Sequence, residues 1–306
     1  MQPEKNPPVW GIDLGGTKIE GVVLRSAQSC DVLSRIRIAT EGERGYCHVV
    51  DRIVGLVERM AEDVGFLPSS LGIGTPGSVD PQNDTLKGSN STHLNGQPLH
   101  RDLGERLGVP VFIENDANCF ALAETHLGAV AERFPEAGCV FGVIMGTGVG
   151  GGFVIDGKLV RGRHGIAGEW GHNFLHESGG PCYCGRTGCV ETILSGHALE
   201  KFYRSLSGHK KNLAEIAAQV EGDACAQKTV NRLHRYLSLA LSQVINIIDP
   251  DVVVIGGGVG NIDSLYSTGL KILEESVFNP YVNTHVVPPK LGDSAGVFGA
   301  ALLTTW

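Results

Sequence analysis

The chain has no run of apolar residues long enough to cross a bilayer, and its first residues, Met1–Pro8, are polar and proline-rich rather than an apolar leader. It also has no excess of basic residues, since the formal net charge is −8. Only 6% of its residues are aromatic, whereas 42% are hydrophobic. We therefore expect a compact, soluble, cytoplasmic protein with no membrane segment and no nucleic-acid partner, whose ligands are small molecules.

Two common nucleotide-binding patterns are missing as well. The sequence contains neither the P-loop pattern G-x4-G-K-[ST] nor a dinucleotide-binding G-x-G-x2-G that opens a helix. Glycine is nevertheless abundant, with 43 residues, and it gathers in short turns after apolar runs. Such turns let a backbone approach a ligand closely, so any nucleotide fold should be of another type.

Apolar runs and helical periods alternate along the 306 residues, which is typical of an α/β protein with two domains. Strands are expected at 9–12, 19–24, 32–38, 71–75, 109–114, 140–145 and 152–155, and helices at about 49–64 and 118–127. The segments 9–17 and 141–150 both read as strand, glycine-threonine turn and strand. This internal echo predicts a duplicated α/β domain with a cleft between the halves.

Three glycine clusters are candidates for nucleotide contacts. The two turns of the echo offer backbone N–H groups and threonine hydroxyls for phosphates, and the third cluster follows the apolar run 252–255, where it could pass the adenosine. An ordinary hairpin turn or a structural glycine is the alternative for each. The candidate residues are Gly15, Gly16, Thr17 and Lys18; Gly146, Thr147 and Gly148; and Gly256, Gly257 and Gly258.

A metal site is expected in the segment 172–189. His172 and the pattern Cys-x-Cys-x4-Cys, formed by Cys182, Cys184 and Cys189, make a four-ligand set suited to a closed, structural zinc site. Free thiols or a disulfide are the alternatives, and a reducing compartment argues against the disulfide.

Several motifs together resemble the ROK family of sugar kinases and repressors, over nearly the whole chain. They are the segments 13–18, 114–118, 146–152 and 169–172 and the cysteine cluster. Within the family, the segments 90–98, 167–173 and 181–185 look most like bacterial fructokinase, also called mannofructokinase, with the N-acetylglucosamine kinases next.

The resemblance implies the actin-like, or hexokinase-like, ATPase fold, in which two α/β domains of the ribonuclease H-like type close over sugar and ATP. We expect an N-terminal domain of residues 1–119 plus 291–306, to which a short terminal helix returns, and a C-terminal domain of residues 120–290 that carries the zinc loop.

The implied reaction is transfer of the γ-phosphoryl group of ATP, with Mg²⁺, to the 6-hydroxyl of a hexose. Asp116 is the expected general base, and a helix cap is its structural alternative. Asp13, at a strand end, could hold Mg²⁺ or merely shape the turn, and the role of Lys18 stays open.

The sugar contacts are also implied by the resemblance. They are Asn90, Asn115, Asp116, Glu169, His172 and Glu191. His172 could bind zinc through one ring nitrogen and a sugar hydroxyl through the other. For the two glutamates, a solvated surface charge is the alternative.

Fructose is the expected substrate, with mannose or glucose as further candidates for the same enzyme. An N-acetylglucosamine or N-acetylmannosamine kinase, or a glucokinase, is the alternative within the family. A sugar-sensing regulator is the non-enzymatic alternative, but too few residues precede the first strand for the DNA-binding domain of family repressors. Relatives are commonly dimers, so a homodimer is expected.

Overall fold

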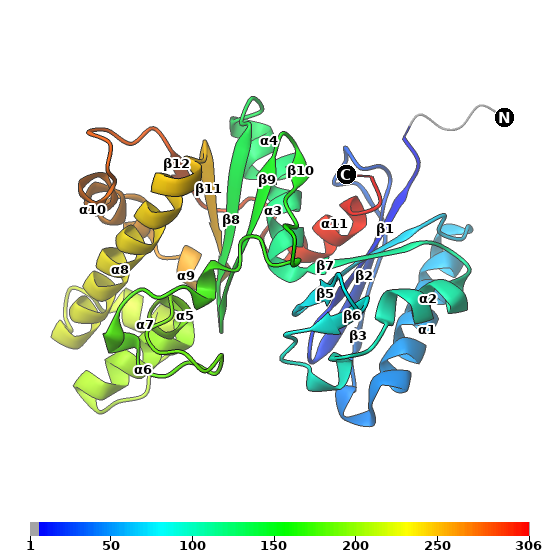
Figure 1. The fold of residues 1–306 in the computed structure, drawn as a ribbon, viewed down its shortest axis with the longest axis horizontal. Coiled ribbons are helices and arrows are strands. Elements are labelled where there is room, and N and C mark those ends of the chain that lie inside the picture. Colours follow the sequence, from blue (N-terminus) through cyan, green and yellow to red (C-terminus); the bar gives the residue numbers. More distant parts are fainter. Residues whose placement is uncertain (1–5, 306) are drawn as a thin grey trace. The chain divides into compact units, whose positions relative to one another are not determined.

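The computed structural model describes residues 6–305, and its internal contacts divide the chain into two compact units. Unit 1 comprises residues up to Arg133, the segment Gly157–Ala167 and the residues from Leu291 onward. Unit 2 comprises Phe134–Asp156 and Gly168–Lys290. Figure 1 shows the elements of both units. Among the described residues, no helix combines the length and apolar character that a membrane span needs.

The sheet of unit 1 has the strand order β3-β2-β1-β4-β7. Neighbours β1, β2 and β3 are antiparallel, whereas β1, β4 and β7 are parallel. The bounds are β1 (Val9–Leu14), β2 (Lys18–Leu24), β3 (Val32–Ala39), β4 (Leu71–Thr75) and β7 (Val111–Asn115). The strands expected in this half are confirmed, with the last one starting two residues later than expected.

One face of this sheet is covered by α1 (Tyr46–Val64), whose apolar stripe packs on Trp10, Ile12 and Leu14. Because successive side chains of a strand point to opposite faces, Gly11 and Asp13 face the other way. There, α11 (Ala295–Leu302) lies so close that a Cβ at Gly11 or at its register partner Gly72 would overlap the α11 backbone. The helix predicted at about 49–64 is confirmed, and Gly65, which caps the C-terminus of α1, is in the left-handed conformation.

Unit 1 contains further helices and short strands. The helices are α2 (Leu99–Leu107), α3 (Asp116–His126) and α4 (Ala129–Arg133), and the strands are β5 (Ser78–Asp80), β6 (Thr85–Lys87) and β10 (Lys158–Leu159). Single 3-10 turns lie at Gly42–Arg44, Thr92–Leu94 and Gly292–Ser294. Helix α3 packs on α11, and His126 bonds to the carbonyl of Gly157, which attaches the segment 157–167 to this unit.

Unit 2 repeats the pattern of unit 1. Strands β8 (Cys139–Met145) and β9 (Val149–Ile155) form an antiparallel pair, and β11 (Val252–Gly256) and β12 (His285–Val287) follow β8 in parallel. The same relation holds for β1, β2, β4 and β7 in unit 1. The duplication predicted from the internal echo is therefore present in the sheets.

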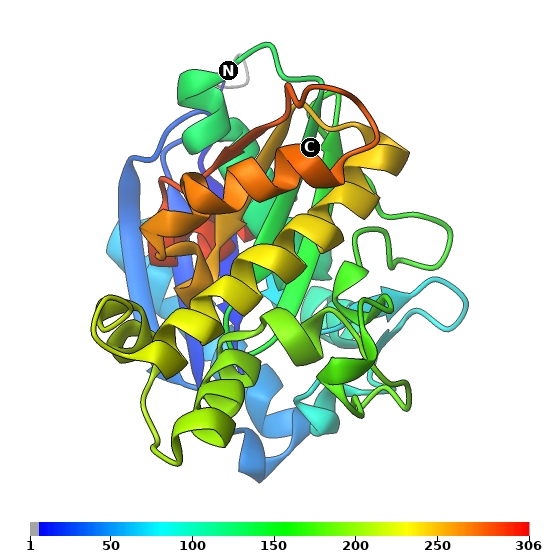
Figure 2. The same ribbon diagram turned by 90° about the vertical axis from the view of Figure 1, so that its left-hand side faces the viewer.

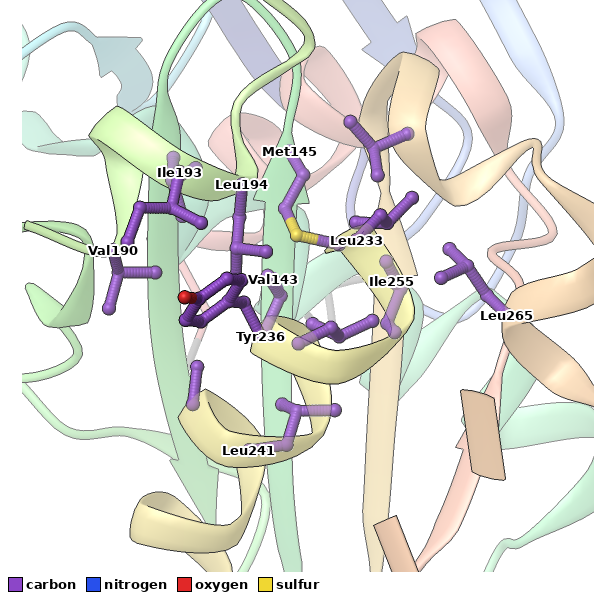
Figure 3. Close-up of a cluster of buried hydrophobic side chains, with 14 of the residues drawn as sticks. Val143, Met145, Val190, Ile193, Leu194, Leu233, Tyr236, Leu241, Ile255 and Leu265 are labelled. Atoms are coloured by element: carbon purple, nitrogen blue, oxygen red, sulfur yellow. The ribbon is translucent and has the colours of Figure 1, made fainter. Parts of the chain in front are cut away.

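Helices cover one face of this sheet. They are α5 (Glu191–Leu194), α6 (Gly196–Ser207), α7 (Leu213–Ala218), α8 (Ala224–Ile248), α9 (Gly257–Gly260) and α10 (Thr268–Ser276), with 3-10 turns at Trp170–His172, Glu177–Gly179 and Asp263–Tyr266. In Figure 2, α8 is the long yellow helix and α10 the orange helix beside it. Figure 3 shows how Leu233 and Tyr236 of α8 pack with Val143, Met145 and Ile255 of the strands.

The unit boundaries differ from the expected domain boundaries. The expected boundary at residue 120 falls within α3, which packs on α11 and belongs as a whole to unit 1. The segment 157–167 joins unit 1 as well, although the expected C-terminal domain included it. The division into functional domains stays a prediction.

Candidate functional site

Hydrogen bonds hold the turn between β1 and β2 in place, and several of its residues are exposed. The N–H of Gly15 donates to the Lys18 carbonyl at 2.9 Å, while the Thr40 hydroxyl donates to the Gly15 carbonyl at 2.7 Å. The Thr40 N–H donates to the Thr17 carbonyl at 3.0 Å. Gly16, Thr17 and Lys18 are exposed. The turn can therefore offer backbone N–H and hydroxyl donors to a ligand without rearranging.

Asp13 precedes this turn, and its carboxylate lies close to Gly296 at the start of α11. Burial, helped by the negative charge of Asp116, raises the pKa of Asp13 from 3.8 to about 6. Glu20 adds to this effect, while Lys18 and Arg37 oppose it. The structure thus brings Asp13 and Asp116 into one electrostatic neighbourhood within unit 1, where a cation would be favourable.

The junction of β7 and α3 positions Asp116. Asn115 is the N-cap: its Oδ1 accepts from the Ala117 N–H at 2.9 Å, and its Nδ2 donates to the Gly77 carbonyl at 3.0 Å. Asp116 is exposed as the first residue of the helix, and its Oδ1 also accepts from the Ala117 N–H at 2.8 Å. The expected helix start near Asn118 was wrong by two residues, because Asn115 rather than Asp116 caps it.

Asn90 lies on a loop that another asparagine holds together. The side chain of Asn95 accepts from the Ser89 N–H and donates to the Ser89 carbonyl, both at 2.9 Å. Asn90 itself is exposed, and its neighbour Ser91 approaches Gly16 of the first turn. Unit 1 therefore gathers its candidate residues around the ends of β1 and β7.

Backbone hydrogen bonds also hold the turn between β8 and β9 in place, as they do in the turn between β1 and β2. The Gly146 N–H donates to the Gly148 carbonyl at 2.9 Å, and the Gly196 N–H donates to the Gly146 carbonyl at 2.8 Å. Glu191, partly buried at the start of α5, accepts from the Val149 N–H at 3.0 Å, and a Cβ on Gly148 would lie 2.6 Å from its Oε2. The alternative of a solvated surface charge therefore does not fit Glu191.

The third glycine cluster lies beside this second turn. Gly256 ends β11 and is paired with Ile144 of β8. Gly257 has φ 79°, and a Cβ there would overlap the carbonyl of Met145, immediately before Gly146. Both glycine features therefore meet at the same edge of the sheet in unit 2, as required for one ligand to contact both.

The expected zinc ligands come together in unit 2. One ring nitrogen of His172 and the three Sγ atoms of Cys182, Cys184 and Cys189 all lie within 4.8 Å of one another. His172 Nδ1 is 3.6 Å from Cys182 Sγ, and the sulfurs of Cys184 and Cys189 are also 3.6 Å apart. In a tetrahedral zinc site with Zn–S of about 2.3 Å, the ligand atoms are about 3.7 Å apart. The four residues therefore fit zinc in both chemistry and spacing.

The backbone around these ligands is tightly turned. The Cys182 N–H donates to the Arg186 carbonyl at 2.8 Å, and Gly185 and Gly188 have φ 85° and 75°. Only glycine adopts such angles readily, so the two glycines permit the folding that brings the thiols together.

With Nδ1 turned toward the thiols, the other nitrogen of His172 points outward. Its Nε2 lies 2.9 Å from the Tyr183 hydroxyl and 4.0 Å from Glu169 Oε1. Desolvation raises the pKa of Glu169, with a smaller effect of Glu191 in the same direction, while His172 opposes both. The sequence reasoning missed Tyr183, although its place between two ligand cysteines could have indicated it.

The predicted site residues thus form two groups. Asp13, the first turn, Asn90, Asn115 and Asp116 belong to unit 1, whereas the other glycine clusters, Glu169, Glu191 and the zinc ligands belong to unit 2. Sequence reasoning also missed the pairing of Glu114 with Arg161 in unit 1, because these residues lie far apart along the chain.

Known proteins resemble this chain over almost its full length. The profile of the ROK family matches residues 9–305. An N-acetyl-D-glucosamine kinase of Vibrio cholerae is 37% identical over 96% of this chain and 98% of its own. A ROK hexokinase structure from Thermus thermophilus superposes with a TM-score of 0.85 at 33% identity, with 97% of each chain covered.

A ROK family glucokinase from Streptomyces griseus, solved in complex with glucose and AMPPNP, has a TM-score of 0.79 at 29% identity and covers 97% of this chain and 98% of its own. The duplicated sheets and these neighbours establish the actin-like ATPase fold that the sequence predicted. With its family profile matched from the first strand to the final helix, the chain belongs to the ROK family.

Proposed function

We propose that this protein transfers the γ-phosphoryl group of ATP to the 6-hydroxyl of N-acetylglucosamine. The supporting observation is the 37% identity to the N-acetyl-D-glucosamine kinase of Vibrio cholerae across 96% of this chain. The broader assignment rests on the family together with its hexokinase and glucokinase neighbours: the protein is a sugar kinase, an ATP:hexose phosphotransferase.

The choice of sugar differs from the first expectation. The motifs suggested fructose, with N-acetylglucosamine next, and the comparisons give no support to fructose. Discrimination between these sugars depends on buried polar groups that pair with each hydroxyl or amide, so a kinase built for one loses much of its rate on another. Glucose and N-acetylmannosamine are the remaining candidates within the family.

In this proposal Asp116 is the general base. Its carboxylate is exposed at the start of α3, where it can accept the proton of a substrate hydroxyl as the hydroxyl oxygen attacks phosphorus. The residues proposed to contact the sugar are Asn90, Asn115, Glu169, His172 and Glu191. Its hydroxyls need both donors and acceptors, which this set supplies.

The phosphates of ATP are assigned to the two glycine-threonine turns, 15–18 and 146–148, and the adenosine part to 256–258. The bonds described above hold both turns in place and use the N–H groups of Gly15 and Gly146. The exposed residues Gly16, Thr17 and Thr147 are therefore the ones that can stabilise charge on the transferring group without reorganising. Asp13 would hold Mg²⁺, which neutralises phosphate charge when bound. The role of Lys18, exposed at the start of β2, is left open.

The zinc ligands have a structural role in this proposal. Zn²⁺ on His172 Nδ1 and the three thiolates would hold the ring so that Nε2 faces outward, beside Glu169. The metal thereby orients a sugar contact but takes no part in phosphoryl transfer.

The decisive experiment is ATP-dependent phosphorylation with Mg²⁺, compared as kcat/KM for N-acetylglucosamine, N-acetylmannosamine, glucose, mannose and fructose. The proposal expects N-acetylglucosamine to exceed the others by at least about tenfold, since polar discrimination in a buried site is strong. A fructose preference would overturn the substrate and restore the first expectation. Absence of turnover on every sugar would favour the sugar-sensing regulator, and light scattering would test the expected homodimer.

A further inference from the structure

A buried carboxylate lies two residues before the proposed base. Glu114, near the end of β7, is only 8% exposed. Its Oε2 accepts from the Asn118 side chain at 3.0 Å, and its Oε1 accepts from the Arg161 Nε. Since Asn118 lies two residues after Asp116, the bond between Glu114 and Asn118 spans the β7–α3 junction on which the base sits. We call Glu114, Asn118 and Arg161 the Glu114 clamp.

The hydrogen bonding of the Asn118 side chain indicates that its role is to hold Glu114. A carboxylate only accepts hydrogen bonds, so the amide NH₂ group must face Glu114. This orientation leaves Asn118 Oδ1 buried without a hydrogen-bond partner among the described residues, and the residue as a whole is only 5% exposed. Buried polar atoms are nearly always paired, and an exception calls for an explanation. Holding Glu114 is the explanation that the contacts support.

Arg161 supplies the positive charge in an acidic neighbourhood. Burial raises the pKa of the Cys119 thiol on α3, as do the negative charges of Glu114, Asp13 and Asp116, and Arg161 opposes them. Of the other elements that pack on α3, α11 and β4 carry no ionisable side chain, whereas α4 carries Glu132 and Arg133 and β10 carries Lys158. Without Arg161, Glu114 would be a buried carboxylate with no opposite charge bonded to it.

We infer that the Glu114 clamp holds Asp116 in the geometry needed for proton transfer, with Arg161 as a positioning residue that acts through Glu114. The inference rests on the proposed function, because it assumes that Asp116 is the base. A shift of about 1 Å in a catalytic group can cost about a hundredfold in rate, so an anchored junction matters although Asp116 itself is exposed.

The test uses Arg161→Gln, Arg161→Lys and, as a matched control, Arg163→Gln. Arg163 lines the same cavity of about 430 Å³ as Arg161, but the described residues show no hydrogen bond or ion pair for it. At saturating sugar, Arg161→Gln should lower kcat by about tenfold or more and leave the KM for ATP within about twofold. Arg161→Lys, which keeps the charge, should recover most of the loss, and Arg163→Gln should match the wild type.

A kcat for Arg161→Gln within about twofold of wild type would overturn the inference, since a displaced base must slow the chemical step. An equal loss in Arg163→Gln would overturn it too, because the effect would then come from the charge of the loop rather than from Glu114.

Amide hydrogen exchange over residues 114–122, without substrates, tests the clamp independently of catalysis. Exchange at the start of α3 should be faster in Arg161→Gln than in wild type or Arg163→Gln, because the junction has lost one of its anchors. Unchanged exchange would refute the clamp whatever the kinetics. If the wild type phosphorylates no sugar, the proposed function fails, while faster exchange in Arg161→Gln still supports the clamp as an anchor of this junction.

Discussion

The raised pKa of Asp13 makes a quantitative prediction about stability. With a pKa of about 6 in the folded protein and 3.8 as its ordinary value, the folded state disfavours the ionised carboxylate. Each tenfold change in an ionisation constant corresponds to about 1.4 kcal/mol, so ionised Asp13 costs the fold about 3 kcal/mol. Asp13→Asn keeps the shape and removes the charge, so it should stabilise the protein by up to that amount at neutral pH.

The sign follows from the direction of the shift. Because the folded pKa is raised, the fold is least burdened below pH 3.8 and loses stability as pH rises toward and through about 6. The stabilisation by Asp13→Asn should therefore be about 3 kcal/mol at pH 7 and about half of that at pH 5. Urea unfolding at both pH values, in buffer without added Mg²⁺ so that no Mg²⁺ binds the carboxylate, measures it.

The exposed Asp263 offers a control, and Asp263→Asn should change stability by less than about 0.5 kcal/mol at either pH. A stabilisation by Asp13→Asn that is equal at pH 5 and pH 7 would refute the linkage, since a packing effect does not depend on ionisation. An Asp13→Asn protein no more stable than wild type at pH 7 would show that the carboxylate is not desolvated as described.

Three further outcomes are expected. Asp116→Asn should lower kcat at least about a hundredfold with an unchanged circular dichroism spectrum, and near-normal turnover would remove it as the base. Cys184→Ser, or chelation of the metal, should lower the zinc content measured by mass spectrometry. Sugar affinity and thermal stability should both fall with it, and intact sugar binding by metal-free protein would contradict the link. Gly72→Ala should lower the free energy of unfolding, measured in urea, by about 3 kcal/mol or more, because its Cβ would overlap the backbone of α11. Gly55→Ala on α1, which has open space around it, is the control and should be neutral or stabilising.

Local features could be predicted from the sequence. Alternating apolar runs joined by glycine-threonine turns predicted both β-hairpins and the duplication, because strand periodicity and turn chemistry are short-range properties. The candidate zinc ligands span only residues 172–189, and Gly185 and Gly188 between them permit the necessary turns, so this cluster could be predicted too. The cap of α3 was missed, since Asn115 and Asp116 are both good caps and only the backbone angles distinguish them.

Contacts between distant segments were decided by the tertiary structure alone. Asp13 acquires its raised pKa from burial and from Asp116, which lies on another strand-helix junction. Arg161 forms an ion pair with Glu114 only because the segment 157–167 packs back onto unit 1. Neither relation leaves a pattern along the chain, because charge interactions depend on distance in space and not on spacing in sequence. The sequence by itself determined the strands, the turns and the candidate metal ligands, and folding determined which carboxylates share an environment and which charge pairs with Glu114.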